Sequence, residues 1–220
     1  MSTQLQQTHS ALAPMEVPDS KLAREIAEFV RDTETELLFN HSNRVYLFGA
    51  LAGARRGLRF DRELLYAGAM FHDVGLMPAY SSATERFEVD GANAARDFLE
   101  ARGIDAQETE RVWTAIALHT TPGIPKHMHP LVALVTAGVE MDVLGLEYEQ
   151  FDAAEREAVV ARFPRTPQFK EDILRAFYDG IAHKPETTFG NVKADVLEAF
   201  DPGFKRGNFC AVIRGSAWRG

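Results

Sequence analysis

Three histidines and one aspartate fall on the apolar faces of predicted helices, where polar side chains are unusual. Each is in register with apolar residues three, four, seven or eleven positions away, which places them on one helical face. The register partners are Val45, Phe48 and Ala52 for His41; Leu65 and Ala69 for His72; Val112, Ala115 and Ile116 for His119; and Leu131, Val135, Gly138 and Val139 for Asp142. The pattern predicts that these four polar side chains point inward, each from a different helix.

An inward-pointing carboxylate needs a partner, because burying an isolated negative charge costs several kcal/mol. A divalent cation near Asp142 would supply one and would reverse the local electrostatics. Imidazole nitrogens and carboxylate oxygens suit zinc, manganese, iron or cobalt, and they suit calcium poorly. Taken singly, each residue has a plainer interpretation, such as a core histidine or an aspartate that pairs with an arginine. The ordered combination is what favours a metal site, and helical bundles commonly build such sites from facing helices.

The elements that must position these residues are helices. The periodicity is helical almost throughout, and no apolar–polar alternation of useful length flanks a hairpin turn. We expect helices over about 19–37, 41–53, 61–72, 90–99, 105–119, 131–144, 151–163 and 169–182. Candidate N-caps are Asp19 or Ser20, Asp61, Asp90, and Asp105 with Glu108. The segment 120–130 contains three prolines and is expected to be a loop.

These elements predict an all-α fold, a single-domain helical bundle. We expect residues 1–18 to form a flexible lead-in, 19–200 the domain, and 201–220 a tail that packs back on it. The length of 220 residues is enough for one sizeable core.

Composition narrows the function classes. The formal net charge of −8 and the lack of a basic stripe argue against a nucleic-acid binder. No apolar stretch approaches the roughly 20 residues of a membrane span, and the N-terminus has no secretory signal, so we expect a cytoplasmic protein. A single cysteine, Cys210, excludes an internal disulfide. The expected partner is a small-molecule substrate, without nucleic acid or membrane, and the aromatic tail makes a homo-oligomer an open expectation.

Three segments in order resemble the HD-domain superfamily of metal-dependent hydrolases: HSNRV (41–45), FHDVGL (71–76) and VEMDVLG (139–145). Within it, NHSNRVYLFG, RFEVDGANAARDFL, IALHTTPGI and the NFC of the tail look like the cyanamide hydratases and related phosphohydrolases, over roughly residues 20–218. The resemblance implies one divalent cation, zinc first and iron, manganese or cobalt as alternatives. It implies the ligands His41, His72, Asp73 and Asp142, in a bundle of the HD-domain type.

At two positions the sequence differs from other classes within the HD-domain superfamily. The two-metal, cyclic-dinucleotide class has a histidine four residues before the Gly-Ala of the fourth helix, where this chain has Phe87. The deoxynucleotide 5′-phosphatases carry a glutamate three residues after the HD aspartate, where Leu76 or Met77 stands here. A single metal is therefore favoured, and the nucleotidase interpretation is weakened.

The expected activity is that of a cyanamide hydratase-like lyase, which adds water to a small nitrile and converts cyanamide to urea. Water on the cation, with its pKa lowered to about 7, would attack the nitrile carbon. Asp73 and His119 are the expected catalytic residues, with His119 transferring the proton to the nitrile nitrogen. Thr120 and Thr121 are expected to bind the substrate.

Two other functions stay open. A phosphohydrolase acting on a nucleotide or other phosphomonoester would use the same metal and water, but it should need several cations around the metal. The motif segments offer mainly Arg44 and Arg86. A non-enzymatic module, with a metal that only holds helices together, would have a closed site without a pocket. His127 and His129 could form a lid or a second metal site, but we expect them on the surface.

Overall fold

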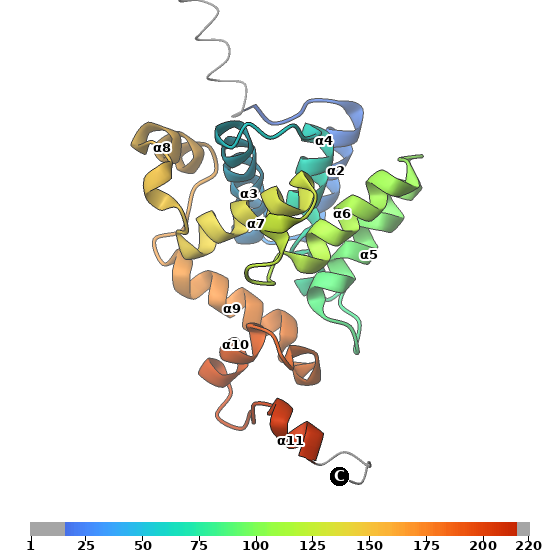
Figure 1. Ribbon diagram of the computed structural model, residues 1–220, viewed down its shortest axis with the longest axis vertical. Coiled ribbons are helices and arrows are strands. Elements are labelled where there is room, and N and C mark those ends of the chain that lie inside the picture. The colour runs from blue at the N-terminus through green and yellow to red at the C-terminus, as the bar shows by residue number, and fades with distance from the viewer. Residues whose placement is uncertain (1–15, 215–220) are drawn as a thin grey trace, which may run out of the picture.

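Helices form every regular element of the computed structural model, which describes residues 16–214 (Figure 1). The long helices are α2 (Lys21–Thr33), α3 (Glu36–Arg55), α4 (Arg62–Phe71), α5 (Phe87–Glu100), α6 (Ala106–Leu118), α7 (Pro130–Val139), α8 (Ala153–Arg162), α9 (Phe169–Ile181), α10 (Lys193–Phe200) and α11 (Phe209–Arg214). Short 3-10 turns lie at Val74–Leu76, Pro125–His127, Tyr148–Gln150 and Pro185–Thr188, and a π-helical turn at Glu140–Leu144. No strand occurs in the described part of the chain, so the predicted all-α fold is confirmed.

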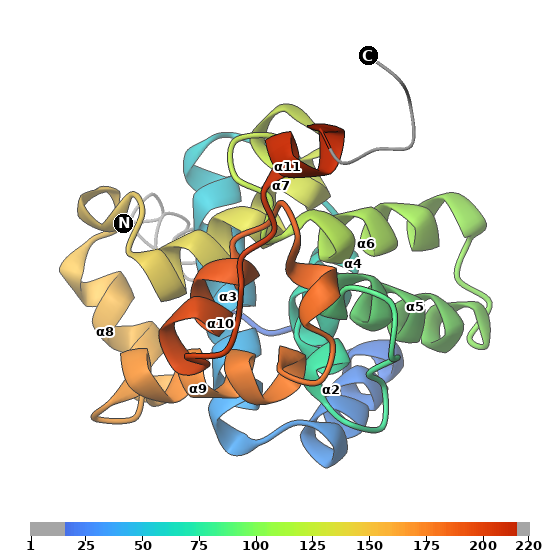
Figure 2. The same cartoon turned by 90° about the horizontal axis from the view of Figure 1, so that it is seen from below.

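The first six long helices and α8 surround one large core, and the C-terminal helices form a second. Helices α3, α4, α6 and α7 pack against one another around the first core, with α5 against α6. The second, smaller cluster joins α9 and α10 to Leu38, Leu76 and Phe87. Figures 1 and 2 show α9 and α10 lying across one end of α3 and α7. Helix α9 packs against α3 and against the turn Val74–Leu76 that follows α4, and this is the border between the two clusters.

Glycines permit two close backbone approaches near this border. A Cβ at Gly138 would overlap the carbonyl oxygen of Val45, so only glycine lets α7 approach α3 there. A Cβ at Gly75 would overlap the carbonyl oxygen of Phe87, where the turn after His72 meets α5. Both contacts fix the positions of segments that carry predicted ligands.

Several helix ends follow the sequence prediction. The Ser20 hydroxyl accepts from the Ala23 N–H, and the Asp61 and Asp105 carboxylates each accept two backbone N–H groups of the helix that they begin. These three N-caps are confirmed. His119 directly follows the last residue of α6, as predicted.

Three predicted boundaries are wrong. The second helix begins at Glu36 rather than near His41. The first helix ends at Thr33 rather than near Leu37, because Thr35 caps a new helix and accepts from the Leu38 N–H. Asp90 is not an N-cap, since α5 begins at Phe87. Its carboxylate instead binds Lys184 Nζ at 2.6 Å and the Ser82 N–H at 2.9 Å. This buried ion pair joins α5 to the segment after α9. Helices α10 and α11 have no counterpart in the prediction.

The predicted domain limits remain predictions, and residues 1–15 and 215–220 lie outside the described part of the chain. Within it, Phe204 packs against the second cluster, and Arg206 pairs with Asp195 of α10 at 2.5 Å. None of the described helices combines the length and the apolar character that a membrane span requires.

Candidate metal centre and its cavity

Four polar side chains converge at the border between the two core clusters: His41, His72, Asp73 and His119. His41 lies in α3, while His72 and His119 occupy the first positions after α4 and α6. Asp73 follows His72 at the start of a 3-10 turn. Each residue is at most 3% exposed. The inward direction that the apolar register predicted for the three histidines is confirmed.

A fixed acceptor sets the tautomer of each histidine. The Nδ1 atoms of His72 and His119 lie 2.6 Å from the carbonyl oxygens of Ala69 and Ile116, respectively. A carbonyl only accepts, so both Nδ1 atoms carry a proton. The Nδ1 of His41 lies 2.7 Å from the Asp142 carboxylate and is a donor for the same reason. In the neutral rings, all three Nε2 atoms therefore present lone pairs toward Asp73.

This arrangement suits a cation. The Nε2 atoms of His41 and His72 are 3.2 Å apart, and neither has a proton to share with the other. Asp73 Oδ2 lies 3.3 Å from His72 Nε2 and 3.7 Å from His41 Nε2, and Asp73 Oδ1 lies 3.8 Å from His119 Nε2. Both Asp73 oxygens are buried without a hydrogen-bond partner in the described structure. Electron pairs facing one another in a buried space are what a divalent metal ion would hold together.

The donor atoms of His41, His72 and Asp73 all lie within 4.8 Å of one another, so these three residues could hold a metal ion. His119 Nε2 stands next to them. Each Nδ1–H donates to a carbonyl or a carboxylate, which is the outer support that metal-binding histidines usually have.

Asp142, the fourth predicted ligand, lies on the other side of His41. Its Oδ2 accepts from His41 Nδ1 and from Arg44 at 2.9 Å, and its Oδ1 accepts from Arg44 at 2.9 Å and Arg165 at 2.7 Å. Direct ligation by Asp142 therefore stays a prediction, because here its carboxylate reaches the cluster only through His41. The π-helical turn carries Asp142 to this position, and such turns are frequent at functional sites.

Arg44 is a structural residue in this arrangement. It is fully buried, and besides its two bonds to Asp142 it donates to the carbonyl oxygens of Phe163 and Pro164 at 3.1 Å. It thereby ties α3 to the segment that leads into α9. Burial would raise the pKa of Asp142, but the bonds and charges of His41 and Arg44 outweigh burial and hold that pKa below its usual range.

Burial also sets the protonation of the cluster. It lowers the pKa of His41 despite the opposing Asp142 carboxylate, and it lowers the pKa of His119 to about 3. Burial raises the pKa of Asp73, but the charge that the surrounding histidines carry when protonated outweighs burial and lowers that pKa below its usual value. Neutral imidazoles and an ionised carboxylate are the forms in which these side chains bind metal ions.

A cavity of about 280 Å³ opens onto the cluster. Besides the four polar residues, Thr120, Thr121, Glu140 and Lys193 contribute to its lining. The rest is Pro122 and an apolar wall, by which we mean Val139, Val143, Leu144, Leu146, Leu174, Phe177, Val192 and Val196. An open cavity beside buried donor groups is typical of a reactive site rather than of a purely structural metal.

A family comparison agrees with this geometry. The model of the HD domain matches residues 38–161, which is more than half of the chain and includes His41, His72, Asp73, His119 and Asp142. The chain is a member of the HD-domain family. HD domains are typically metal-dependent hydrolases, and the buried His/Asp cluster is compatible with that chemistry. No curated protein matched the chain.

Lys193 lies outside the part that the HD-domain model matches, and the sequence analysis missed it. It is the first residue of α10 and is 5% exposed. Its Nζ lies 3.7 Å from the centroid of the Phe177 ring and 4.9 Å from that of Phe87. No side-chain hydrogen bond or ion pair of Lys193 occurs among the described residues. The signal was present, because Lys193 is in register with Val196, Leu197 and Phe200, the same criterion that singled out the histidines.

The hydroxyl groups of the two threonines predicted to bind the substrate differ in how free they are to form new hydrogen bonds. Thr120 donates to Glu88 Oε1 and accepts from Arg86 at 3.2 Å, so its hydroxyl hydrogen is already committed. Glu88 is 1% exposed and also pairs with Arg86 at 2.7 Å. Thr121, which is half-buried, makes no side-chain hydrogen bond within the described structure. Both threonines line the cavity, and their role in binding stays a prediction.

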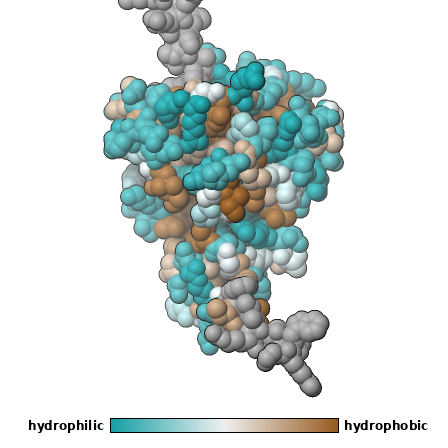
Figure 3. Space-filling model, in the orientation of Figure 1, coloured by the Kyte–Doolittle hydropathy of each residue, from teal (hydrophilic) through white to brown (hydrophobic). Residues whose placement is uncertain are grey.

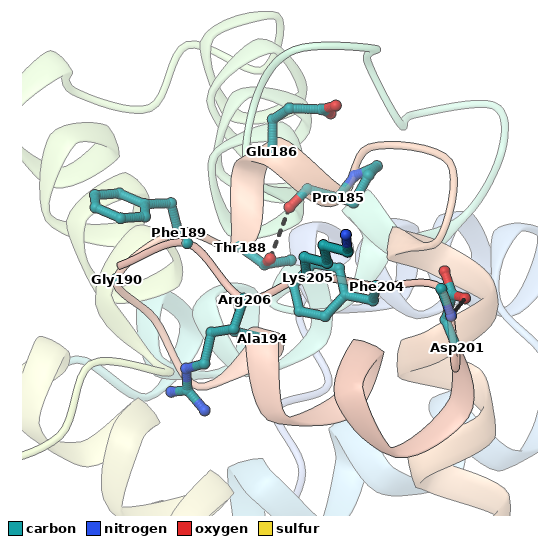
Figure 4. Close-up of a pocket in the computed structure, with 12 residues that line it drawn as sticks. Pro185, Glu186, Thr188, Phe189, Gly190, Ala194, Asp201, Phe204, Lys205 and Arg206 are labelled. Carbon is teal, nitrogen blue, oxygen red and sulfur yellow. Dashed lines mark hydrogen bonds between the residues drawn. The ribbon is translucent and has the colours of Figure 1, made fainter. Parts of the chain in front are cut away.

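Among the residues that the structure describes, no second group of three or more His, Cys, Asp or Glu side chains could hold a metal ion. His127 and His129 are exposed, as predicted. A second cavity of about 380 Å³ lies between the turn Pro185–Thr188 and residues 201–207 (Figure 4). Its lining contains no histidine, and the Thr188 hydroxyl that faces it already donates to the Pro185 carbonyl at 2.7 Å. We therefore place the candidate site at the histidine cluster.

Proposed function

We propose that this HD-domain protein adds water to a small uncharged nitrile, with the conversion of cyanamide to urea as the reference reaction. The observation that carries the proposal is the lining of the cavity. It joins the His/Asp cluster to an apolar wall, and Lys193 is the one Lys or Arg side chain in the lining described by the structure. A phosphoester would call for several cationic donors, and Arg44 and Arg86 are both held by carboxylates.

The metal would be held by His41, His72 and Asp73, with His119 Nε2 beside them and Asp142 fixing His41 from outside. A divalent cation there, zinc first, would lower the pKa of water and make it a nucleophile near neutral pH. His119 has its only ring proton on Nδ1, bound to the Ile116 carbonyl, so Nε2 can accept a hydrogen bond from the attacking water. We therefore change its proposed role from proton donor to orientation of water.

The nitrile nitrogen then needs another proton source, and we assign it to Lys193. The water oxygen bonds to the nitrile carbon while a π-electron pair moves to nitrogen, which takes a proton from Lys193 Nζ. The proton that water loses leaves to solvent through the open side of the cavity, and Lys193 is reprotonated from solvent. The resulting imidic acid tautomerises to the amide. Burial lowers the pKa of Lys193, against the charges of Glu88 and Asp73, which makes its ammonium a better acid.

Paired assays test the function. Metal-loaded protein should form urea from cyanamide, and His72→Ala or Asp73→Ala should remove bound metal and urea formation together. Phosphate release from a panel of phosphomonoesters, without urea from cyanamide, would reject the hydratase in favour of the phosphohydrolase.

Lys193 has its own test. Lys193→Gln should lower kcat by about 10²-fold or more while metal content stays at the wild-type level. Lys193→Arg should retain little of the proton transfer, because a guanidinium is a far weaker acid. Lys126→Gln, a change in the exposed loop, is the matched control and should behave as wild type. A Lys193→Gln enzyme with unchanged kcat and an unchanged pH profile would exclude Lys193 as the proton source.

A further inference from the structure

The apolar wall is larger than a molecule as small as cyanamide can use. The cavity of about 280 Å³ corresponds to about nine water volumes of about 30 Å³ each. Cyanamide has three non-hydrogen atoms. Most of the cavity would then hold water against valine and leucine side chains, which is unfavourable for both.

The mouth of the cavity is also apolar. Leu144, Leu146, Leu174 and Val192 belong to the apolar wall and are 66%, 48%, 36% and 39% exposed, respectively. Figure 3 shows hydrophobic surface gathered in patches on the central part of the face seen in Figure 1. Large apolar side chains that gather at one opening mark a binding site more often than isolated ones do.

The polar side and the apolar side of the cavity are therefore suited to bind different parts of one ligand. The histidine cluster, Asp73 and Lys193 face a polar, reacting group, while the apolar wall extends from them to the opening. Half of this wall lies beyond the residues that match the HD-domain model: Leu174 and Phe177 in α9, Val196 in α10, and Val192 directly before α10. The shared domain thus supplies the reactive groups, and the C-terminal helices complete the wall.

We propose that the preferred substrate carries an apolar substituent on its reacting group, an alkyl or aryl chain that lies along the apolar wall. The identity of the reacting group as a nitrile rests on the proposed function, whereas the apolar substituent rests on the wall. The substrate class is then that of organic nitriles or N-alkylcyanamides, and cyanamide is a minimal member.

A series of substrates with alkyl chains of increasing length measures how much the apolar wall contributes to substrate recognition. For N-methyl- to N-butylcyanamide, kcat/KM should rise about fourfold for each added methylene, which corresponds to about 0.8 kcal/mol per buried CH₂. The rise should be about 60-fold over the three methylenes. A flat or falling series would overturn the inference.

Variants locate the effect. Leu174→Asn and Leu144→Asn should each reduce the increase per methylene, because they place a polar group in the wall. Ile124→Asn is the matched control, since Ile124 is 56% exposed but does not line the cavity, and it should keep the wild-type series. An equal reduction in the Ile124 variant would point to a general loss of stability and would count against the wall.

Binding of the products separates this inference from the proposed function. Calorimetry with N-methyl- to N-butylurea and the metal-loaded protein should show the same fourfold step in affinity. If no cyanamide is hydrated but the ureas bind with this step, the proposed function fails and the apolar substituent stands. If cyanamide is hydrated without any dependence on chain length, the function stands and the inference fails. Absence of both hydration and urea binding would reject both.

Discussion

In the metal-free protein, loss of the charge of Asp142 should be more destabilising than loss of the charge of Asp73. Asp142 accepts hydrogen bonds from Arg44, Arg165 and His41, whereas both oxygens of Asp73 are buried without a partner. Removing the charge of Asp142 leaves the guanidinium of Arg44, which is 0% exposed, without its counter-ion. Removing the charge of Asp73 breaks no hydrogen bond.

Breaking a buried ion pair on one side costs about 3–5 kcal/mol. Asp142→Asn should therefore lower the free energy of unfolding of the metal-free protein by about that amount. With an m-value of about 2 kcal/mol per M, the midpoint of urea unfolding falls by about 2 M. Asp73→Asn should lower this free energy by less, because it breaks no hydrogen bond, although the lowered pKa of Asp73 means that the folded protein favours its charged form.

Metal affinity should show the reverse order. Asp142 acts on the metal through His41, and loss of such an outer partner typically weakens binding about 10–100-fold. Asp73→Asn removes a ligand and should abolish binding at concentrations that saturate the wild type. Urea unfolding in the presence of a chelator and calorimetric titration with Zn²⁺ measure the two quantities.

Two results would refute this reasoning. Equal destabilisation of the metal-free protein by both substitutions would mean that Asp73 has structural partners of its own. Complete loss of Zn²⁺ binding by a folded Asp142→Asn variant would make Asp142 a direct ligand, as the family resemblance implies.

Two further predictions concern stability. Burial, and then the charge of Asp73, raises the pKa of the Glu34 carboxyl well above 4.5. The folded protein therefore binds this proton more tightly than the unfolded chain does. The free energy of unfolding should fall as the pH rises above about 4.5. Glu34→Gln should remove that part of the pH dependence in urea unfolding from pH 4.5 to 8, whereas Glu28→Gln, an exposed control, should keep it. Gly138→Ala should lower the free energy of unfolding by about 1–3 kcal/mol, because its methyl group meets the Val45 carbonyl oxygen within a helix that has little freedom to move. An unchanged Tm of the Gly138→Ala protein would show that α7 and α3 can move apart at little cost in free energy.

The sequence by itself determined the helical class and the direction of the reactive histidines. Both follow from local rules: a helix repeats every 3.6 residues, so a polar residue in register with apolar ones must face the core. The same rule identifies His41, His72 and His119 without any tertiary information. N-caps such as Ser20 and Asp61 are also local, because the side chain bonds to backbone groups two or three residues away.

Only the tertiary structure decided which partners those inward side chains meet. Register places Asp142 on an apolar face but does not show that Arg44 and Arg165, 98 and 23 residues away in sequence, occupy its oxygens. Asp90 has the sequence of an N-cap, yet the pairing with Lys184 across 94 residues gives it a different role. Lys193 enters the cavity because α10 packs against α9, and this packing between separate helices is contained in no local rule. Spacing along the chain determines which side of a helix a residue lies on. Hydrogen bonds and ion pairs between distant segments determine the protonation state and the role of the side chains on that side.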